Sequence, residues 1–283
     1  MIIYITGPNG ILGNALSLYL LKKNFKLVLI TSNKKKIYRK FKNYLHLIKI
    51  LDYKNLKSIK FKTSKKKNLF IHLAGASNNF FRTYKDLYEA NVVTTHKVLN
   101  FCIKNKISNF YLLSSLSVYS HKNKSIIHKK LSKKPTTNYG RTKLKAENLA
   151  LNICNKNRIS LTIIRIPSVY GAYTKGKSRL LRSLINFNIP LPVKGIKLKR
   201  SYLSVDYFMS SILRLIKMKK KLSQIFITDQ NDLTLNELVD KLNFNSKKIY
   251  KYNLIKYLPN FMKNCLLNFR SIRKLIILKN EKF

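Results

Sequence analysis

Short apolar runs and longer amphipathic stretches alternate along the first 170 residues of the chain. Residues 85–104 are of the second type, because apolar side chains recur there every three or four positions, as at Leu87, Ala90 and Val98. The apolar runs of strand length are residues 1–5, 26–30, 45–50, 68–72, 109–113 and 160–166. Strands that alternate with helices in this way form a parallel sheet covered on both faces. The pattern therefore predicts an α/β fold with a doubly wound parallel sheet.

The regular alternation ends after Gly171. Pro190 and Pro192 follow there, and proline cannot occupy the interior of a helix or of a central strand. We therefore expect residues 1–170 to form the main sheet domain. Residues 171–283 should form mainly a smaller C-terminal lobe, with some return to the main sheet.

Two further elements are expected in the C-terminal part. Residues 226–228 have the character of one more strand. Residues 233–242 have the character of a helix, for which Asp232 or Thr234 would serve as the N-cap.

Three glycines, Gly7, Gly10 and Gly13, lie between the first predicted strand and the helical pattern that follows it. At such positions one glycine permits a sharp turn, the next lets a pyrophosphate approach the backbone, and the third lets the helix pack closely on the strand. The N–H groups and the positive dipole end of the helix then face the phosphates. The spacing predicts the dinucleotide-binding corner of a Rossmann-type sheet; the alternative is a strand–turn–helix without a ligand.

The end of the second predicted strand carries no carboxylate for an adenosine ribose, and Thr31, Ser32 and Lys34 stand there instead. Hydroxyls and a lysine suit a 2′-phosphate, so NADP(H) is favoured as the cofactor and NAD(H) is possible. The alternative is that these lysines are only solvated loop charge. After the fourth predicted strand, the small residues Ala74 and Gly75 would let the backbone pass close to a cofactor.

Tyr139 and Lys143 are four residues apart, so they project from one face of a predicted helix. A tyrosine with its ordinary pKa of about 10 is a poor base at neutral pH. A nearby ammonium is expected to lower that pKa, and a serine at the end of the adjacent strand could bind the same substrate oxygen. The pattern predicts a general acid/base for oxidising an alcohol or reducing a carbonyl.

The chain has a formal charge of +48, from 58 basic and 10 acidic residues. Such a charge by itself favours a nucleic acid or an anionic membrane as partner. The lysines are spread along the whole chain, however, together with many Asn, Ile, Tyr and Phe residues, which indicates biased coding composition and solvated faces. We expect no specific nucleic-acid site and only a general attraction to polyanions that fades with salt.

Cys102, Cys154 and Cys265 are far apart, and the histidines show no metal-ligand spacing. The sequence therefore predicts neither a disulfide framework nor a metal site. No apolar stretch reaches the roughly 18 residues of a spanning helix, so no transmembrane segment is expected. The reducing cytoplasm is the expected location.

Several segments follow the pattern of one known family. They are TGPNGILG at 6–13, Asp52-Tyr53, HLAG at 72–75, Asn91-Val92, SSLSVY at 114–119, YGRTK at 139–143, RIPSVYG at 165–171 and RSYLSVD at 200–206. In these segments the chain resembles the extended short-chain dehydrogenases/reductases, in the NAD-dependent epimerase/dehydratase family that acts on nucleotide sugars. The resemblance implies that the first domain binds NAD(P) and that the C-terminal lobe binds the substrate.

The resemblance also assigns roles to particular residues. Ser115 would be the catalytic hydroxyl and would form a triad with Tyr139 and Lys143. Asp52 would bind the adenine edge, and Arg200 would bind the diphosphate of the sugar nucleotide.

Other positions are expected to contact one of the two ligands. Further cofactor contacts are Asn9, Ile11, Tyr53, Leu73, Asn91 and Ile166, together with Tyr139 and Lys143. Further substrate contacts are Ser117, Ser168 and Lys177. Ser168 stands where the family often has Asn, and Lys177 stands where a subgroup of it usually has Asn.

The implied activity is that of an NAD(P)-dependent oxidoreductase or epimerase that acts at C4 of a nucleotide sugar. Residues 189–206 resemble the subgroup that serves surface polysaccharide synthesis, and reduction of a UDP-4-keto-6-deoxy-N-acetylhexosamine is the nearer likeness. One alternative is a UDP-glucose or UDP-N-acetylglucosamine 4-epimerase. An alternative of another class is a non-catalytic dinucleotide-binding protein that docks on RNA or membrane through its charge. A homodimer through the helices following Asn91 and Tyr139 is also expected.

Overall fold

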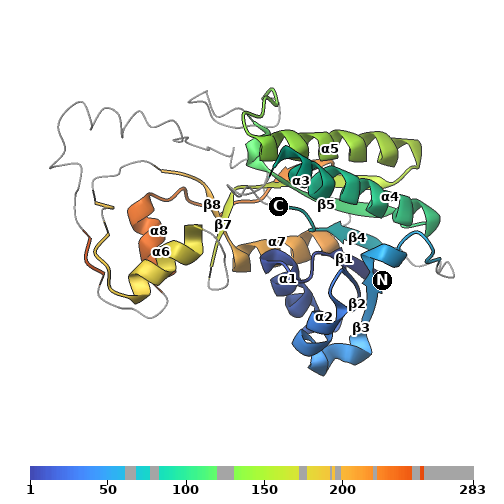
Figure 1. Ribbon diagram of the computed structural model, residues 1–283, viewed down its shortest axis with the longest axis horizontal. Coiled ribbons are helices and arrows are strands. Elements are labelled where there is room, and N and C mark those ends of the chain that lie inside the picture. The colour runs from blue at the N-terminus through green and yellow to red at the C-terminus, as the bar shows by residue number, and fades with distance from the viewer. Residues whose placement is uncertain are drawn as a thin grey trace. The chain divides into compact units, whose positions relative to one another are not determined.

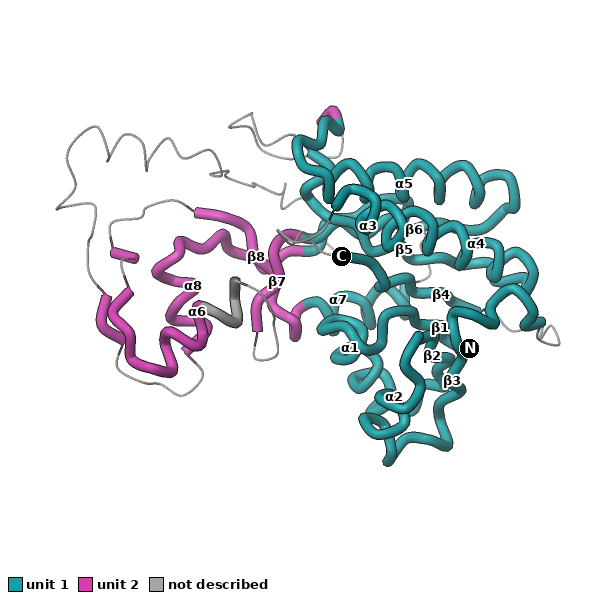
Figure 2. Tube along the Cα trace, in the orientation of Figure 1, with its two compact units in different colours: residues 1–119, 133–166, 208–227 teal, residues 120–132, 167–207, 228–283 magenta. Residues whose placement is uncertain are grey.

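A computed structural model describes residues 1–60, 68–76, 83–119, 131–171, 177–191, 193–194, 199–218, 222–243 and 249–251, without the side chains of 177–180. The chain divides into two compact units (Figure 2). Unit 1 consists of Met1–Tyr119, Lys133–Ile166 and Phe208–Ile227. Unit 2 consists of Ser120–Ser132, Pro167–Tyr207 and Thr228–Phe283.

A seven-stranded sheet forms the centre of unit 1, with the strand order β3–β2–β1–β4–β5–β6–β9 (Figure 1). The strands are β1 (Ile2–Thr6), β2 (Lys26–Thr31), β3 (Ile48–Asp52), β4 (Leu69–His72), β5 (Asn109–Ser115), β6 (Ser160–Ile166) and β9 (Gln224–Phe226). All neighbouring pairs are parallel, and the order reverses between β1 and β4. The predicted doubly wound parallel sheet is confirmed, and the reversal is the point at which such sheets bind their ligands.

Helices cover both faces of this sheet. Figure 1 shows α1 (Ile11–Leu21) and α2 (Lys34–Lys40) on one side, and α3 (Tyr84–Tyr88), α4 (Thr94–Lys104) and α5 (Asn138–Lys156) on the other. The longest of them, α5, packs against β5 and β6 and against α3 and α4. This packing brings the start of α5 to the carboxyl end of β5.

The core of unit 1 explains why its strands are apolar throughout. A parallel sheet covered on both faces must bury both sides of each strand, and all four residues of β4 are buried. Under α4, the rings of Tyr4 and Phe70 stack with centroids 5.9 Å apart, and those of Phe70 and Phe110 with centroids 5.5 Å apart. Phe101 of α4 meets Phe70 edge-on at 6.1 Å. These aromatic contacts join β1, β4 and β5 to the helix layer.

The limits of three elements differ from those expected. Residues Lys42–Leu47 form a 3₁₀ helix, so β3 begins at Ile48 and not at residue 45. The helix expected over residues 85–104 is divided into α3, a π-helical segment (Glu89–Val93) and α4. The last strand of the sheet ends at Phe226, the residue at which it was expected to begin.

Unit 2 contains a parallel pair of short strands, β7 (Ser168–Tyr170) and β8 (Tyr202–Ser204), and the helices α6 (Lys177–Asn186) and α8 (Leu235–Leu242). Its core includes Tyr170, Ile185, Leu191, Leu238, Val239 and Leu242. α7 (Val205–Lys217) begins in unit 2 and continues in unit 1.

Two local hydrogen-bond arrangements organise unit 2. Thr234, one of the two expected N-caps, forms a capping box with Glu237 at the start of α8. Asp229 joins β7 and β8, because it accepts hydrogen bonds from the Tyr170 hydroxyl at 2.6 Å and from the Ser204 backbone N–H at 2.9 Å. None of the described helices is long and apolar enough to cross a membrane.

Candidate active site

The turn between β1 and α1 depends on two glycines. Gly7 has φ +72°, and a Cβ at this position would lie 3.0 Å from the backbone of Ala74. A Cβ at Gly13 would lie 2.1 Å from the carbonyl oxygen of Gly7, which is too close for any side chain. Gly7 therefore permits a left-handed turn beside the loop that follows β4, and Gly13 lets α1 pack directly on the turn.

The start of α1 has the features of a phosphate site. Gly10 is exposed and is the N-cap of the helix, and no side chain caps the first turn, which begins at Ile11. The first N–H groups of a helix have no partner within the helix, and they carry the positive end of its dipole. The turn therefore fits the pyrophosphate that the glycine spacing predicts.

Asn9 and Thr31 connect this turn to the end of β2. The Asn9 amide donates to the Thr31 hydroxyl at 2.8 Å, and the Asn33 backbone N–H donates to the same oxygen at 3.0 Å. The Asn9 Oδ1 atom is buried without a hydrogen-bond partner in the described part of the chain. A buried acceptor of this kind is costly unless a donor reaches it. This unpaired acceptor beside the glycine turn is what a bound dinucleotide could satisfy.

The other residues expected at the adenosine end follow in the same region. Ser32 is exposed, and Lys34 is half-buried at the start of α2. Asp52, which pairs with Thr31 across the β2–β3 register, accepts a hydrogen bond from the Lys54 backbone N–H at 2.9 Å. Tyr53 is half-buried, and burial raises the pKa of its phenol.

A chain of hydrogen bonds, here called the His72 chain, links the end of β1 to the π-helical segment. The Thr6 oxygen accepts from the N–H groups of Leu73 and Ala74, so its own proton is directed to His72 Nδ1, 2.7 Å away. His72 Nε2 then donates to Thr95, which donates to the Asn91 carbonyl. This assignment requires a neutral imidazole. Burial, with a smaller effect from Lys143, lowers the pKa of His72 to about 3 and keeps it neutral.

The predicted cofactor residue Asn91 has its side-chain amide engaged within the protein. Its Oδ1 accepts from the Ala76 backbone N–H at 3.0 Å, and its Nδ2 donates to the Thr142 hydroxyl at 3.1 Å. A Cβ at Gly75 would lie 2.5 Å from Asn91 Oδ1. Asn91 therefore holds the 73–76 loop against α5, and the π-helical segment places it there.

The predicted catalytic residues meet where β5 ends and α5 begins. Ser115 is the last residue of β5, and its hydroxyl donates to the Ser117 hydroxyl at 3.2 Å. The ammonium of Lys143 is buried and donates to the Leu113 carbonyl at 2.7 Å. A Cβ at Gly140 would lie only 2.1 Å from the Ser117 carbonyl oxygen, so glycine is needed for α5 to approach β5 this closely.

The ionisation of this pair differs from the expectation that Lys143 lowers the pKa of Tyr139. Burial raises the pKa of the Tyr139 phenol, and hydrogen bonding with Ser115 only partly opposes this. Burial also lowers the pKa of the Lys143 ammonium to about 8, against the attraction of Glu147. Burial thus acts on both groups in the direction that opposes their ionisation.

Sequence reasoning missed a set of buried polar residues beside the triad, here called the Glu147 network. Glu147 and Arg165 have fully buried side chains and form a bidentate ion pair, with Nε–Oε1 and Nη2–Oε2 distances of 2.9 and 2.7 Å. Ser114 donates to Glu147 at 2.6 Å, and Arg165 donates to the Tyr119 hydroxyl at 2.9 Å. Two sequence signals could have found them: the i+4 spacing of Glu147 after Lys143, and a charged residue inside the apolar strand β6.

The remaining predicted residues are distributed over both units. Ile166, the last residue of β6, is buried in unit 1. In unit 2, Ser168 is exposed at the start of β7, and Arg200 is half-buried, with its backbone paired to Leu233. Lys177 begins α6, but its side chain lies outside the described residues. The described residues contain no group of three or more His, Cys, Asp or Glu side chains placed to hold a metal.

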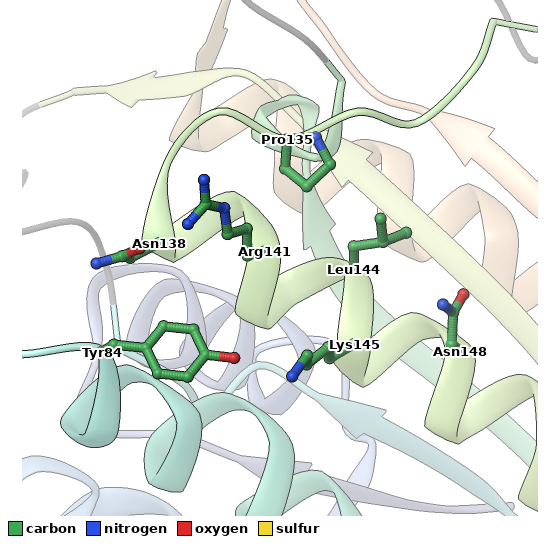
Figure 3. Close-up of a pocket in the computed structure, with 7 residues that line it drawn as sticks. All are labelled: Tyr84, Pro135, Asn138, Arg141, Leu144, Lys145 and Asn148. Atoms are coloured by element: carbon green, nitrogen blue, oxygen red, sulfur yellow. The ribbon is translucent and has the colours of Figure 1, made fainter.

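A separate depression of about 480 Å³ lies beside α5 in unit 1 (Figure 3). It is lined by Tyr84, Pro135, Asn138, Arg141, Leu144, Lys145 and Asn148. The Lys145 ammonium lies over the rings of Tyr84 and Tyr88, 5.7 and 5.5 Å from their centroids. None of the residues predicted for the active site lines this depression, which belongs to the α3–α5 surface.

Comparison with known proteins identifies related sequences. The model of the NAD dependent epimerase/dehydratase family matches residues 3–224. A dTDP-D-glucose 4,6-dehydratase from Dictyostelium discoideum is 26% identical over 234 residues, covering 74% of this chain and 54% of that protein. A UDP-glucose 4-epimerase from Vibrio cholerae is 31% identical over 110 residues, covering 38% of this chain and 34% of that protein. The chain thus spans about half or less of the length of these curated relatives.

Solved structures of similar fold cover most of the chain. UDP-glucuronic acid 4-epimerase from Bacillus cereus in complex with NAD has a TM-score of 0.73 and 20% identity, covering 89% of this chain and 85% of that one. RMD from Pseudomonas aeruginosa complexed with NADPH has a TM-score of 0.70 and 20% identity, covering 89% and 87%. At this identity the likeness shows the fold.

The glycine turn generates a direct test with a matched pair of variants. Gly10→Val should abolish dinucleotide binding without unfolding the protein, because Gly10 is exposed, its φ of −75° suits any residue, and the atom that a Cβ would approach is the Gly7 carbonyl oxygen, at 3.2 Å. Gly13→Ala should instead lower stability, by about 1–3 kcal/mol, because its Cβ collides with the Gly7 carbonyl. The measurements are calorimetric titration with NAD⁺ and NADP⁺, and thermal unfolding. Wild-type affinity in Gly10→Val would show that the phosphates bind elsewhere.

Proposed function

Because the chain belongs to the NAD dependent epimerase/dehydratase family, we propose that it is an NAD(P)-dependent enzyme acting at C4 of a nucleotide sugar. The reaction we favour is reduction of a UDP-4-keto-6-deoxy-N-acetylhexosamine for surface polysaccharide synthesis. The observation that carries the proposal is the meeting of Ser115, Tyr139 and Lys143 at the β5–α5 junction. The second candidate, a UDP-hexose or UDP-N-acetylhexosamine 4-epimerase, is favoured by the named epimerase relatives.

In the proposed mechanism, the Tyr139 hydroxyl donates a proton to the C4 oxygen during reduction and takes it back in the reverse direction. Ser115 donates a hydrogen bond to the same oxygen and orients it. Lys143, held by the Leu113 carbonyl, supplies a positive charge that stabilises the phenolate left behind. The nicotinamide supplies the hydride chemistry when the cofactor is bound.

The residues that would hold the cofactor are those around the strand-order reversal. Gly7, Gly10 and Gly13, with Asn9 and Ile11, would bind the pyrophosphate. Thr31, Ser32 and Lys34 would face the adenosine ribose, where they favour a 2′-phosphate and hence NADP(H). Asp52 and Tyr53 would contact the adenine. Leu73, Ala74, Gly75 and Ile166 would line the nicotinamide side, and Asn91 would act through the loop that it supports.

The substrate contacts and partners follow the same proposal. Ser117, Ser168, Lys177 and Arg200 would bind the nucleotide sugar, with Arg200 on its diphosphate. The homodimer through the helices that follow Asn91 and Tyr139 remains a prediction, as does the cytoplasmic location.

The proposed reaction can be tested with a panel of UDP-sugars and their 4-keto derivatives, incubated with NADPH or NADH and followed at 340 nm. A 4-ketoreductase should consume the reduced cofactor in proportion to product. An epimerase should interconvert the sugars, which chromatography detects, with no net change at 340 nm. Inactivity on the whole panel, by protein that binds the cofactor, would overturn the proposed function.

Cofactor preference should depend on Lys34. Lys34→Glu should weaken NADP⁺ relative to NAD⁺ by roughly tenfold, or ~1.4 kcal/mol, because an anion would face the 2′-phosphate. Lys156→Glu makes the same charge change at the exposed C-terminal end of α5 and should leave the ratio unaltered. The ratio is obtained from the two dissociation constants. A wild-type protein that prefers NAD⁺ would contradict the assignment.

Tyr139→Phe should reduce kcat by about 10²–10⁴, because the change removes the proton donor and keeps the ring. KM and cofactor affinity should change little, because the phenyl ring preserves the packing. Ser115→Ala should cost less, since it removes one hydrogen bond. Tyr84→Phe, which removes an exposed phenol from α3, is the matched control. If Tyr139→Phe keeps more than about a tenth of the wild-type kcat, Tyr139 is not the catalytic acid. The loss would then be less than about tenfold, which is smaller than the loss expected for a general acid.

A further inference from the structure

Glu147 lies one helical turn after Lys143 on α5, on the face that points to the sheet. Its side chain is fully buried, and both of its oxygens are hydrogen-bonded. Removing a carboxylate from water is expensive, so its presence beside the triad calls for an explanation.

The position of Glu147 is fixed from β6. Arg165 holds both carboxylate oxygens and is itself held by the hydroxyl of Tyr119 at 2.9 Å and by Oε1 of Gln224 at 3.0 Å. The Arg165 guanidinium also lies over the rings of Tyr119 and Phe226, 5.4 and 6.0 Å from their centroids. The carboxylate therefore has one well-defined place, which Arg165 on β6, residues of β9 and Tyr119 determine.

From that place, Glu147 acts on β5 next to the catalytic serine. Ser114 donates to Glu147 Oε1 at 2.6 Å, while the preceding residue, Leu113, accepts from the Lys143 ammonium at 2.7 Å. Two consecutive residues of β5 are thus bonded to two consecutive turns of α5. Ser115 is the next residue, so its register against Tyr139 is set by this double attachment.

The charged and titratable groups around Lys143 come from several elements. α5 contributes Glu147 and the neutral phenol of Tyr139, and β4 contributes the neutral imidazole of His72. Glu147 faces Arg165 from β6 and, more weakly, Lys133 at 3.7 Å. Among these groups of the described chain, Glu147 supplies the negative charge that acts on the Lys143 ammonium.

We propose that Glu147 is a positioning residue of the active site, which keeps Lys143 in its ammonium form and, through Ser114, holds Ser115 in register with Tyr139. Its effect on catalysis rests on the proposed function, whereas its effect on Lys143 can be measured without a substrate. The direction follows from the local electrostatics. Burial lowers the pKa of Lys143 to about 8 and Glu147 opposes that change, so removal of the Glu147 charge should lower this pKa further.

The first experiment uses the wild-type protein and NMR of ¹³C-labelled glutamate and lysine side chains. The chain has four glutamates, Glu89, Glu147, Glu237 and Glu281, so the carboxyl spectrum is simple. Glu147 is assigned by elimination, from Gln variants of the other three, and Lys143 is assigned from Lys143→Arg. The Glu147 carboxyl signal should shift with the same midpoint as Lys143. A Glu147 signal that is insensitive to the titration of Lys143 would overturn the proposal.

The second experiment compares Glu147→Gln with Glu89→Gln, which removes the same charge at an exposed position. Glu147→Gln should lower the Lys143 midpoint by at least one pH unit, or about tenfold in proton affinity. The alkaline limb of the kcat–pH profile should move by a similar amount, and Glu89→Gln should move neither. A Glu147→Gln protein that loses stability and activity equally at all pH values, with an unchanged Lys143 midpoint, would show a purely structural role. If Glu147→Gln does not fold, the NMR titration of the wild-type protein decides whether Glu147 and Lys143 interact.

Ser114→Ala separates the two parts of the proposal, because it removes the bond to β5 and leaves every charge in place. It should lower kcat by about tenfold while the Lys143 midpoint stays at its wild-type value. Wild-type kcat in Ser114→Ala would overturn the role of Glu147 in holding Ser115. A failure of the panel assay would disprove the proposed function but would leave the NMR results to be judged on their own.

Discussion

A polar group that is buried without a hydrogen-bond partner costs free energy, and in unit 1 two networks of buried side chains meet this requirement beside the candidate site. The His72 chain satisfies it between β1, β4 and the π-helical segment, and the Glu147 network satisfies it between β5, α5 and β6. A buried ion pair such as Glu147–Arg165 gains little stability over apolar residues of similar volume, yet losing one partner is very costly. Such groups therefore act mainly by specifying one arrangement, and here that arrangement includes the residues proposed to be catalytic.

The parallel sheet was predictable because burial on both faces leaves strands as near-continuous apolar runs. Strand β6 was predicted with its observed limits, 160–166. The predictions of secondary structure were wrong where a local sequence pattern was compatible with more than one conformation. Leu45 and Leu47 are apolar and belong to a 3₁₀ helix, and the periodicity of residues 85–104 contains no sign of the π-helical turn at Asn91. The Asn91 side chain on that turn is bonded to Ala76 and Thr142, which come from other parts of the chain.

In the candidate site, too, some features could be predicted from the sequence and others could not. The geometry of the glycine turn and the common helix face of Tyr139 and Lys143 could be predicted because both depend on short, fixed spacings in the sequence. The roles of these residues stay predictions. The protonation of that pair could not be predicted, because the degree of desolvation is a property of the folded protein. Glu147 and Arg165 are 18 residues apart, and their contact arises only when β6 packs beside α5. A charged residue in an apolar strand indicates a buried partner but does not identify it.

The scarcity of acidic residues gives the Glu147 network further meaning. Seven of the ten acidic side chains accept hydrogen bonds within the described fold: Asp52, Asp86, Glu147, Asp229, Asp232, Glu237 and Asp240. Several of them cap helices or turns, where a carboxylate has a local function that no lysine could replace. The large positive charge therefore reflects abundant basic residues along the chain, while the carboxylates that do occur are concentrated where the fold needs an acceptor. Glu147 is therefore one of the few carboxylates that the fold needs as an acceptor, whereas the positive surface charge is a separate property of the composition.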